Sequence, residues 1–324
     1  MILTTLRERL LGRGRRRYPK IFQVEVFAGC NLRCPLCHAG RKEIERTARV
    51  LSLEQFEHIW DKIEPFAELL YLHIWGEPTL NKHLVSMVAH VSKRKPACQT
   101  NVSTHGNGLS RDYAFRLVAA GLHQLIVSID GFDQASYEKY RVGGNYEDAL
   151  SFLRWAAEAK QELNSSILIV AQCLATRHTE TERQRYHAQV GFPGVSVVHK
   201  PLYIGGYGID YKEFLSSDID VQVPTLASCS ALSDVLAIQA DGSIIPCCLY
   251  PVVAPGFDLG NILESTVQEL FEKRDRWEMH RQIKSGQSPT KYCEQACGQR
   301  STAVQESEKK TLSLPVIVPE KLSA

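Results

Sequence analysis

Gly29-Cys30-Asn31-Leu32-Arg33-Cys34-Pro35-Leu36-Cys37-His38 holds three cysteines within eight residues, at the spacing C-x3-C-x2-C. An apolar run at 21–27 precedes it, which predicts that the cysteines lie on a loop directly after a strand. Three thiolates on one loop can bind three irons of a four-iron cluster and leave the fourth iron without a protein ligand. Zinc would need a fourth ligand, and His38 could supply it only if the chain folded back sharply after Cys37. The pattern C-x-x-C-H over Cys34–His38 also fits a c-type haem attachment site, but that site requires an exported protein.

Composition narrows the classes of function. Of the 324 residues, 44% are hydrophobic and 23% are charged, and the net charge of +2 predicts no polyanionic partner such as nucleic acid. The chain has no apolar run long enough for a membrane-spanning helix, so we expect no membrane partner. The basic residues near the N-terminus are not followed by the apolar core of a signal peptide. The chain has ten cysteines, and we expect a cytoplasmic protein in which the clustered ones bind metal rather than form disulfides.

Strand and helix patterns alternate six times through the first two thirds of the chain. Strands are predicted at 21–27, 69–74, 98–103, 124–128, 166–173 and 195–199. Helices are predicted after the N-cap Ser52 and at 83–92, 110–120, 146–159 and 179–189. Short connections between them favour a parallel sheet rolled into a partial (β/α)6 TIM-type barrel. In such a barrel, functional residues lie on loops at the carboxyl ends of the strands.

The alternation stops near residue 205, and the pattern that follows is different. Two short apolar segments joined by Asp241-Gly242 predict a β-hairpin over 235–246, and a helix is predicted over 266–284. The basic N-terminal segment is either a solvated leader or a docking surface for an acidic electron donor. The expected parts are a basic leader at 1–20, the partial barrel at 21–204, a linker at 205–228, a small β-hairpin/helix domain at 229–298 and a disordered tail at 299–324.

The cysteine loop resembles the signature of radical S-adenosylmethionine (SAM) enzymes. The resemblance implies that Cys30, Cys34 and Cys37 bind a [4Fe-4S] cluster, and that SAM occupies the open iron. Leu36 stands where that family usually has an aromatic residue. Its backbone is still expected to meet the adenine of SAM.

Other predicted strand ends resemble further motifs of the same family. Trp75-Gly76-Glu77-Pro78 resembles G-G-E-P with its first glycine replaced, which implies that Gly76, Glu77 and Pro78 receive the SAM amino group. Ser128-Ile129-Asp130-Gly131 resembles S-x-D-G, which implies that Ser128 and Asp130 are SAM contacts. Arg141 resembles the arginine that pairs with the SAM carboxylate, a task that suits a bidentate guanidinium. Thr104-His105-Gly106-Asn107 resembles a T-N-G loop, which leaves His105 as either a substrate contact or a neutral variation.

The later cysteines form a pattern that resembles a second kind of iron–sulfur site. Cys229, Gly242 and Cys247 fit C-x(9–15)-G-x4-C, the start of the SPASM and twitch domains that carry auxiliary [4Fe-4S] clusters. Cys248 neighbours Cys247, so the two side chains are expected to diverge and Cys248 to be a spare thiol. A zinc ribbon is the alternative. The resemblance, which is nearer to the shorter twitch type, implies one auxiliary cluster held by Cys229, Cys247, Cys293 and Cys297.

Together these resemblances imply a radical SAM enzyme that cleaves SAM to a 5′-deoxyadenosyl radical, which abstracts hydrogen from a substrate. A cluster with four thiolate ligands has no open iron, so we expect the auxiliary cluster to accept an electron and the net reaction to be a dehydrogenation. Residues 1–20 are too few for a peptide-recognition domain, which favours a small polar metabolite such as a sugar or cyclitol. A one-electron donor such as flavodoxin or ferredoxin is implied as a partner.

Two alternatives to this function stay open. One is a peptide-modifying radical SAM enzyme, a maturase or epimerase, in which Cys248 donates hydrogen. A more remote one is a non-enzymatic iron–sulfur or zinc module. His105, Lys200 and Cys248 are the candidate catalytic groups. The candidate substrate contacts are His73, His105, Arg177, His199, Lys200 and Tyr203.

Overall fold

The computed structural model of the chain describes residues 18–44, 46, 49–175, 179–201, 229–249, 256–294 and 297. Five predictions therefore lie outside the described residues. These are Arg177, Tyr203, the linker at 205–228, the tail at 299–324 and all but the last three residues of the basic leader.

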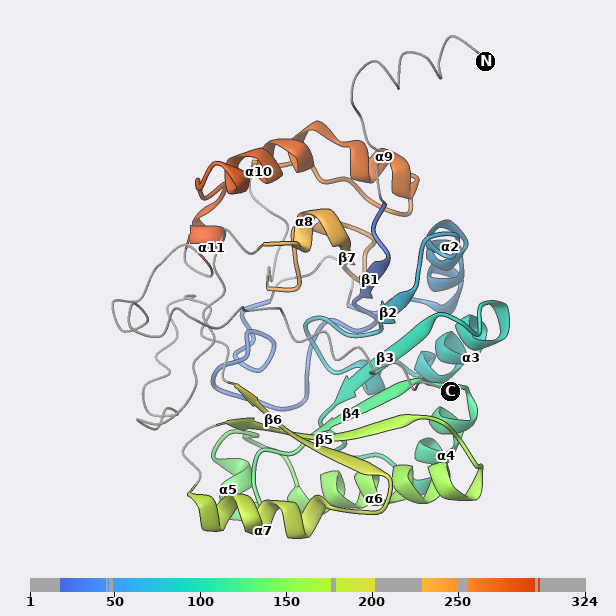
Figure 1. Ribbon diagram of the computed structural model, residues 1–324, viewed down its shortest axis with the longest axis vertical. Coiled ribbons are helices and arrows are strands. Elements are labelled where there is room, and N and C mark those ends of the chain that lie inside the picture. The colour runs from blue at the N-terminus through green and yellow to red at the C-terminus, as the bar shows by residue number, and fades with distance from the viewer. Residues whose placement is uncertain are drawn as a thin grey trace, which may run out of the picture.

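The described residues form an α/β fold around one sheet, in the order β6-β5-β4-β3-β2-β1-β7-β8 (Figure 1). The first seven strands are parallel to their neighbours, and β8 alone runs antiparallel, beside β7. This confirms the partial (β/α)6 barrel with a small C-terminal hairpin and helix domain. The barrel strands are β1 (Ile21–Val24), β2 (Leu69–Tyr71), β3 (Gln99–Thr104), β4 (Gln124–Ser128), β5 (Leu168–Ala175) and β6 (Val195–Pro201).

The longer barrel helices pack on one side of this sheet (Figure 1). The helix after β1 begins as predicted, because Ser52 forms a reciprocal capping box with Gln55. Two short elements were not predicted, the 3-10 helix η1 (Pro78–Leu80) and α5 (Gln134–Glu138). The longer helices are α2 (Leu53–Ile63), α3 (Leu84–Arg94), α4 (Arg111–Ala119), α6 (Tyr146–Glu162) and α7 (Glu180–Val190).

The two faces of the sheet differ in burial, because alternate side chains of a strand point to opposite faces. The face toward the helices is fully buried at Phe22, Val24, Leu70, Val102, Leu125 and Ile169. The alternate positions keep partial solvent contact and are mostly polar. We call this second side of the sheet the inner face; it includes Gln23, Tyr71, Ser103, Gln124 and Gln172.

The C-terminal hairpin extends the sheet of the barrel, which the sequence did not predict. After α8 (Ala231–Asp234), β7 (Val235–Ile238) runs parallel to β1, and β8 (Ile244–Ile245) turns back along it. The predicted turn at Asp241-Gly242 is confirmed: Gly242 has φ +85°, and a Cβ there would lie 2.4 Å from Asn261 Oδ1.

The single helix predicted at 266–284 is wrong, because the chain breaks into α9 (Val267–Glu272) and α10 (Arg274–Lys284). Lys273 leaves the helical conformation with ψ 137°. At 3.6 residues per turn, a straight helix would place the buried residues of α9 and those of α10 on nearly opposite sides. The break lets both helices bury their apolar sides, and α11 (Lys291–Cys293) follows.

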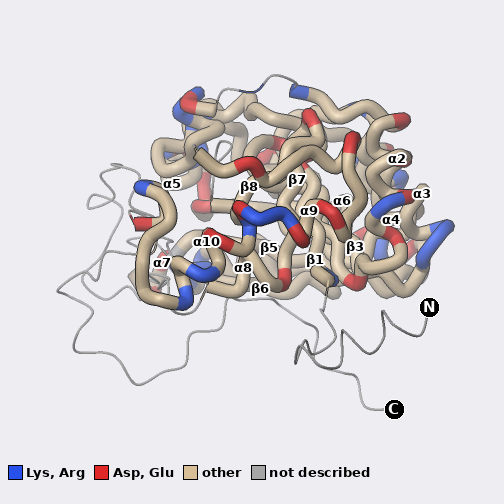
Figure 2. Tube along the Cα trace, turned by 90° about the horizontal axis from the view of Figure 1, so that it is seen from above, with Lys and Arg blue, Asp and Glu red and all other residues tan. Residues whose placement is uncertain are grey.

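Basic and acidic residues are interspersed along the described elements (Figure 2). None of the helices in the described part of the chain is long and apolar enough to cross a membrane.

Candidate active site

The loop after β1 gathers the three predicted cysteines. Cys30 lies within electrostatic reach of both Cys34 and Cys37. The backbone N–H of Leu32 donates to Cys30 Sγ at 3.3 Å, and Leu36, between Cys34 and Cys37 in the sequence, is half-buried. Burial raises the pKa of Cys30 to about 12 and that of Cys34 to about 11. Without iron these thiols keep their protons, so binding of a cluster must release them.

His38 is engaged away from these thiols. Its Nδ1 pairs with Glu43 Oε2 at 2.9 Å, and its ring packs edge-on against Trp75. Among the residues that the structure describes, no three His, Cys, Asp or Glu side chains lie close enough to hold a single metal ion. A four-iron cluster makes a different demand, because each thiolate binds a different iron. Three thiols on one loop are the donor set that fits a cluster with one open iron.

Gly76 joins the loop after β2 to the cysteine loop. It has φ +121°, and a Cβ at this position would lie 2.2 Å from Phe27 O and 2.8 Å from Gly29 N. The next residue continues the contact, since Glu77 N donates to Gly29 O at 2.7 Å. The glycine is therefore required by the close approach of two backbone segments, whatever ligand lies beyond them.

Glu77 is almost fully buried, with 3% of its surface exposed, and its carboxylate faces protein donors. Its Oε1 accepts from the Thr104 hydroxyl at 2.7 Å and from both the N–H and the hydroxyl of Thr79. Its Oε2 accepts from His105 N at 3.0 Å. Three of these four bonds fall on Oε1, so Oε2 accepts only one of them and keeps acceptor capacity. Glu77 thus caps η1, where Pro78 is the first residue, and fixes the loop after β3.

His105 links that loop to the cysteine loop. Its Nδ1 accepts from Asn107 N at 3.0 Å, so the ring proton is on Nε2, which donates to Asn31 Oδ1 at 2.9 Å. Burial lowers the pKa of His105, and the ring is neutral. Both ring nitrogens therefore bond to protein atoms. Sequence reasoning missed Asn31, although it stands inside the cysteine motif.

Arg141 approaches the cysteine loop from the other side. Its Nε donates to Asp130 Oδ2, and its Nη1 points toward Cys34 Sγ at 3.8 Å. The second oxygen of Asp130 accepts from Leu174 N at 2.6 Å. Ser128 lies two residues before Asp130 at the end of β4 and is 6% exposed. The structure thus brings the predicted SAM contacts to one end of the barrel, around the three thiols.

The later cysteines form a second group. Cys247 lies within electrostatic reach of Cys229 and Cys297. Cys293 stands four residues before Cys297, and Cys229, Cys247 and Cys293 each pack against the edge of the core. These are the four predicted ligands of the auxiliary cluster, and four thiols fit a closed iron–sulfur site.

Cys248 faces a different region from Cys247. Its thiol is hydrogen-bonded to the Gln23 side chain and lies within electrostatic reach of Lys200. Cys248 also lies near Tyr71, and protein surrounds it although it keeps solvent contact. Cys247 and Cys248 are close enough to interact electrostatically, yet it is Cys248 that reaches Gln23, so the hairpin brings the auxiliary site to within one residue of the inner face.

The other candidate substrate contacts lie on both sides of β6 and at the end of β2. His73 Nδ1 accepts from Ser103 N at 3.2 Å, and burial lowers the pKa of His73 to about 4. Lys200 stands near Cys248 and keeps solvent contact on the inner face. His199 points the other way, with its Nε2 3.0 Å from His187 Nε2 of α7, so it does not reach the inner face.

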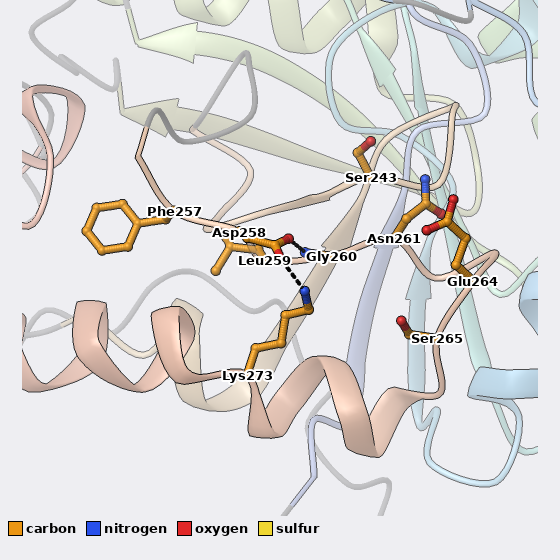
Figure 3. Close-up of a pocket in the computed structure, with 9 residues that line it drawn as sticks. All are labelled: Ser243, Phe257, Asp258, Leu259, Gly260, Asn261, Glu264, Ser265 and Lys273. Carbon is orange, nitrogen blue, oxygen red and sulfur yellow. Dashed lines mark hydrogen bonds and ion pairs between the residues drawn. The ribbon is translucent and has the colours of Figure 1, made fainter.

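A separate hollow of about 330 Å³ lies on the C-terminal domain (Figure 3). Lys273 pairs there with Asp258, which also accepts from Gly260 N at 2.9 Å. The hollow contains none of the cysteines and none of the predicted SAM contacts. We therefore do not place the active site there.

Comparison with known protein families identifies both parts of this arrangement. The radical SAM superfamily profile matches residues 24–173, and the SPASM profile, an iron–sulfur cluster-binding domain, matches residues 229–298. Fe-coproporphyrin III synthase of Methanosarcina barkeri is 33% identical over 122 residues, which are 37% of this chain and 30% of that protein. The chain spans less than half the length of the first curated relatives that it matches.

Solved structures share the fold. A crystal structure of BtrN in complex with AdoMet and 2-DOIA superposes with a TM-score of 0.53 at 17% identity, covering 82% of this chain and 87% of that one. Streptococcus suis SuiB bound to S-adenosylmethionine superposes with a TM-score of 0.64 at 12% identity, covering 86% and 72%. Radical SAM and SPASM domains together imply three cofactors here: SAM, its [4Fe-4S] cluster and an auxiliary [4Fe-4S] cluster.

Proposed function

We propose that this chain, which belongs to the radical SAM superfamily and carries a C-terminal SPASM domain, dehydrogenates a small polar metabolite such as a sugar or cyclitol. When bound, SAM and the two clusters supply a 5′-deoxyadenosyl radical that takes a hydrogen atom from the substrate, and an acceptor for the second electron. The protein must then hold the substrate between the two iron sites and remove one proton from it.

The position of the hairpin supports an oxidation. Cys247 groups with the auxiliary thiols, while the very next residue, Cys248, contacts Gln23 on the inner face. A substrate bound against the inner face would therefore lie beside the auxiliary site. A cluster held by the auxiliary thiols would then be placed to accept an electron from the substrate.

Lys200 is our candidate for the group that accepts the hydroxyl proton. It stands at the end of β6 on the inner face, and no acidic side chain pairs with it in the described part of the chain. Desolvation by the surrounding protein lowers the pKa of Lys200, the direction that favours a proton acceptor. An alcohol would thus lose a hydrogen atom, an electron and a proton, and become a ketone.

The residues around the three thiols would orient SAM. The backbone carbonyls of the turn at 76–78, together with the Glu77 carboxylate, would take the SAM ammonium, since Glu77 Oε2 accepts only one of the four protein hydrogen bonds. Arg141 would take the SAM carboxylate, held in place by Asp130. Ser128 and the backbone of Leu36 stay predicted contacts.

The decisive experiment measures 5′-deoxyadenosine and product together, with anaerobic, reconstituted protein and a panel of amino sugars, cyclitols and short peptides. Dithionite can replace the proposed flavodoxin or ferredoxin donor. We expect one 5′-deoxyadenosine per product, and a product lighter by two hydrogen atoms. A product of unchanged mass would contradict the oxidation, and failure to cleave SAM at all would favour a non-enzymatic iron–sulfur module.

The accessible thiol of Cys248 favours a second candidate, a peptide-modifying or epimerising enzyme. There the thiol would give a hydrogen atom to the substrate radical, and one electron and one proton would restore it. SuiB, which shares the fold, has also been crystallised with its precursor peptide SuiA. In deuterated water this reaction would place deuterium on carbon, and Cys248→Ser would abolish the label. The oxidation adds no deuterium.

A further inference from the structure

Four polar side chains line the inner face at one level of the sheet. Strand register places Gln23 of β1 beside Tyr71 of β2, Tyr71 beside Asn101 of β3, and Asn101 beside Gln124 of β4. We call Gln23, Asn101 and Gln124 the carboxamide layer. None of the motifs described above includes these three residues.

The carboxamide layer holds buried atoms without a protein partner. Asn101 Nδ2 donates to Gln124 Oε1, while Asn101 Oδ1 and Gln124 Nε2 have no protein partner, nor does Gln23 Oε1. Turning both amides of the Asn101–Gln124 pair over would exchange the roles but still leave one donor and one acceptor. The pair therefore offers a donor and an acceptor together.

The sheet itself does not require polar residues at this level. In the same register, Gln23 has Ala237 of β7 on its other side, and Gln124 has Leu168 of β5. Apolar side chains thus fit both ends of the level. A buried polar group without a partner lowers the stability of the fold. The carboxamides therefore make the fold less stable than alanine or leucine at the same positions would.

The geometry points to a subsite in which the carboxamide layer binds a neutral hydroxyl or carboxamide group of the substrate. This inference rests on the proposed function. A single hydroxyl or amide can both donate and accept, as the layer requires, whereas a charged group would meet only neutral partners there.

The subsite lies far from the reacting atoms. Gln124 is the first residue of β4, and Ser128, at the cofactor end, is the last. At about 3.3 Å per residue, the two lie roughly 13 Å apart along the strand. Contacts so far from the chemistry would hold the substrate in place for the radical and couple SAM cleavage to turnover.

The test is the double variant Asn101→Leu/Gln124→Leu of the full chain with both clusters. Gln99→Leu is the matched control, because it makes the same change at an exposed position of β3 outside the layer. We expect an unfolding temperature unchanged or raised, and wild-type SAM cleavage without substrate. With a substrate found in the panel above, product formed per 5′-deoxyadenosine should fall about 10- to 100-fold.

Three outcomes would decide against the subsite. A fall in unfolding temperature of more than about 5 °C would make the layer structural. A stable variant that still forms wild-type product per 5′-deoxyadenosine would also overturn the subsite. So would a substrate complex in which only ordered water contacts the unpartnered atoms of the carboxamide layer. If no compound in the panel couples in the wild type, the proposed function fails, and the unfolding temperature alone then decides whether the layer is structural.

Discussion

The cofactor end of the barrel and its inner face use polar side chains in opposite ways. At the cofactor end, Glu77 accepts four hydrogen bonds from protein and Asp130 bonds to both Arg141 and the β5 backbone. On the inner face, Lys200 and Cys248 keep solvent contact, and the carboxamide layer keeps unpartnered atoms. One region is rigid before its ligand arrives, and the other leaves its bonds for the ligand. Substitutions at the cofactor end and on the inner face should therefore have different effects.

The largest effect should come from the first cluster. Cys30→Ala should lower dithionite-driven SAM cleavage on the order of 1000-fold or more, because no protein group can replace the cofactor. Cys293→Ala, in the second thiol group, should leave measurable cleavage. Cys98→Ala is the control, since Cys98 is buried in the core away from both groups. Equal and total loss in both variants would mean that the auxiliary cluster is structural.

Gly76→Ala should remove the first cluster and spare the second. The new Cβ collides with Phe27 O, and the cysteine loop must move. We expect iron to fall from about eight to about four atoms per chain. Gly108→Ala is the matched control, because Gly108 also has a positive φ (+71°) but has nothing within 4 Å of its Cβ position. Near four irons or stoichiometric zinc in the wild type would contradict two clusters.

Lys200→Met should separate the two regions further. If Lys200 takes the substrate proton, substrate-dependent product formation should fall about 100-fold, the usual size of a base effect. SAM cleavage without substrate should stay at the wild-type rate, because the cofactor end is intact. Lys93→Met, on the surface helix α3, is the control. Parallel loss of both activities would place Lys200 among the residues that hold SAM.

The smallest effect should appear in stability against pH. Burial lowers the pKa of His73 from an ordinary 6.5 to about 4, so the unfolded chain binds more protons between these values. Stability from the neutral ring is present above pH 6.5 and is lost as pH falls toward 4. Between pH 7.5 and pH 5 the wild type should lose about 2 kcal/mol more than His73→Gln in denaturant unfolding. Equal slopes for the two proteins would show that His73 is not buried in this way.

The same contrast explains how much could be predicted. The six strands were predicted correctly. Cys30, Glu77 and Asp130 could be proposed as cofactor contacts from the sequence, because they lie in contiguous motifs at strand ends. Asn101 and Gln124 come from separate strands, and only register shows that they meet. His199 was misplaced for a related reason, since a one-residue step along β6 moves a side chain to the other face of the sheet.

The pairing of β7 with β1 changes how the C-terminal domain should be regarded. β1 leads into the first cysteine group, and β7 belongs to the hairpin that leads into the second. The two strands are paired over four consecutive residues. The spacing between the two iron sites is therefore set by hydrogen-bonded backbone rather than by a flexible tether. Truncation after the barrel would uncover the unpaired edge of β1, and such an edge invites strand exchange and aggregation. The C-terminal domain therefore completes the sheet of the barrel as well as carrying the auxiliary cysteines.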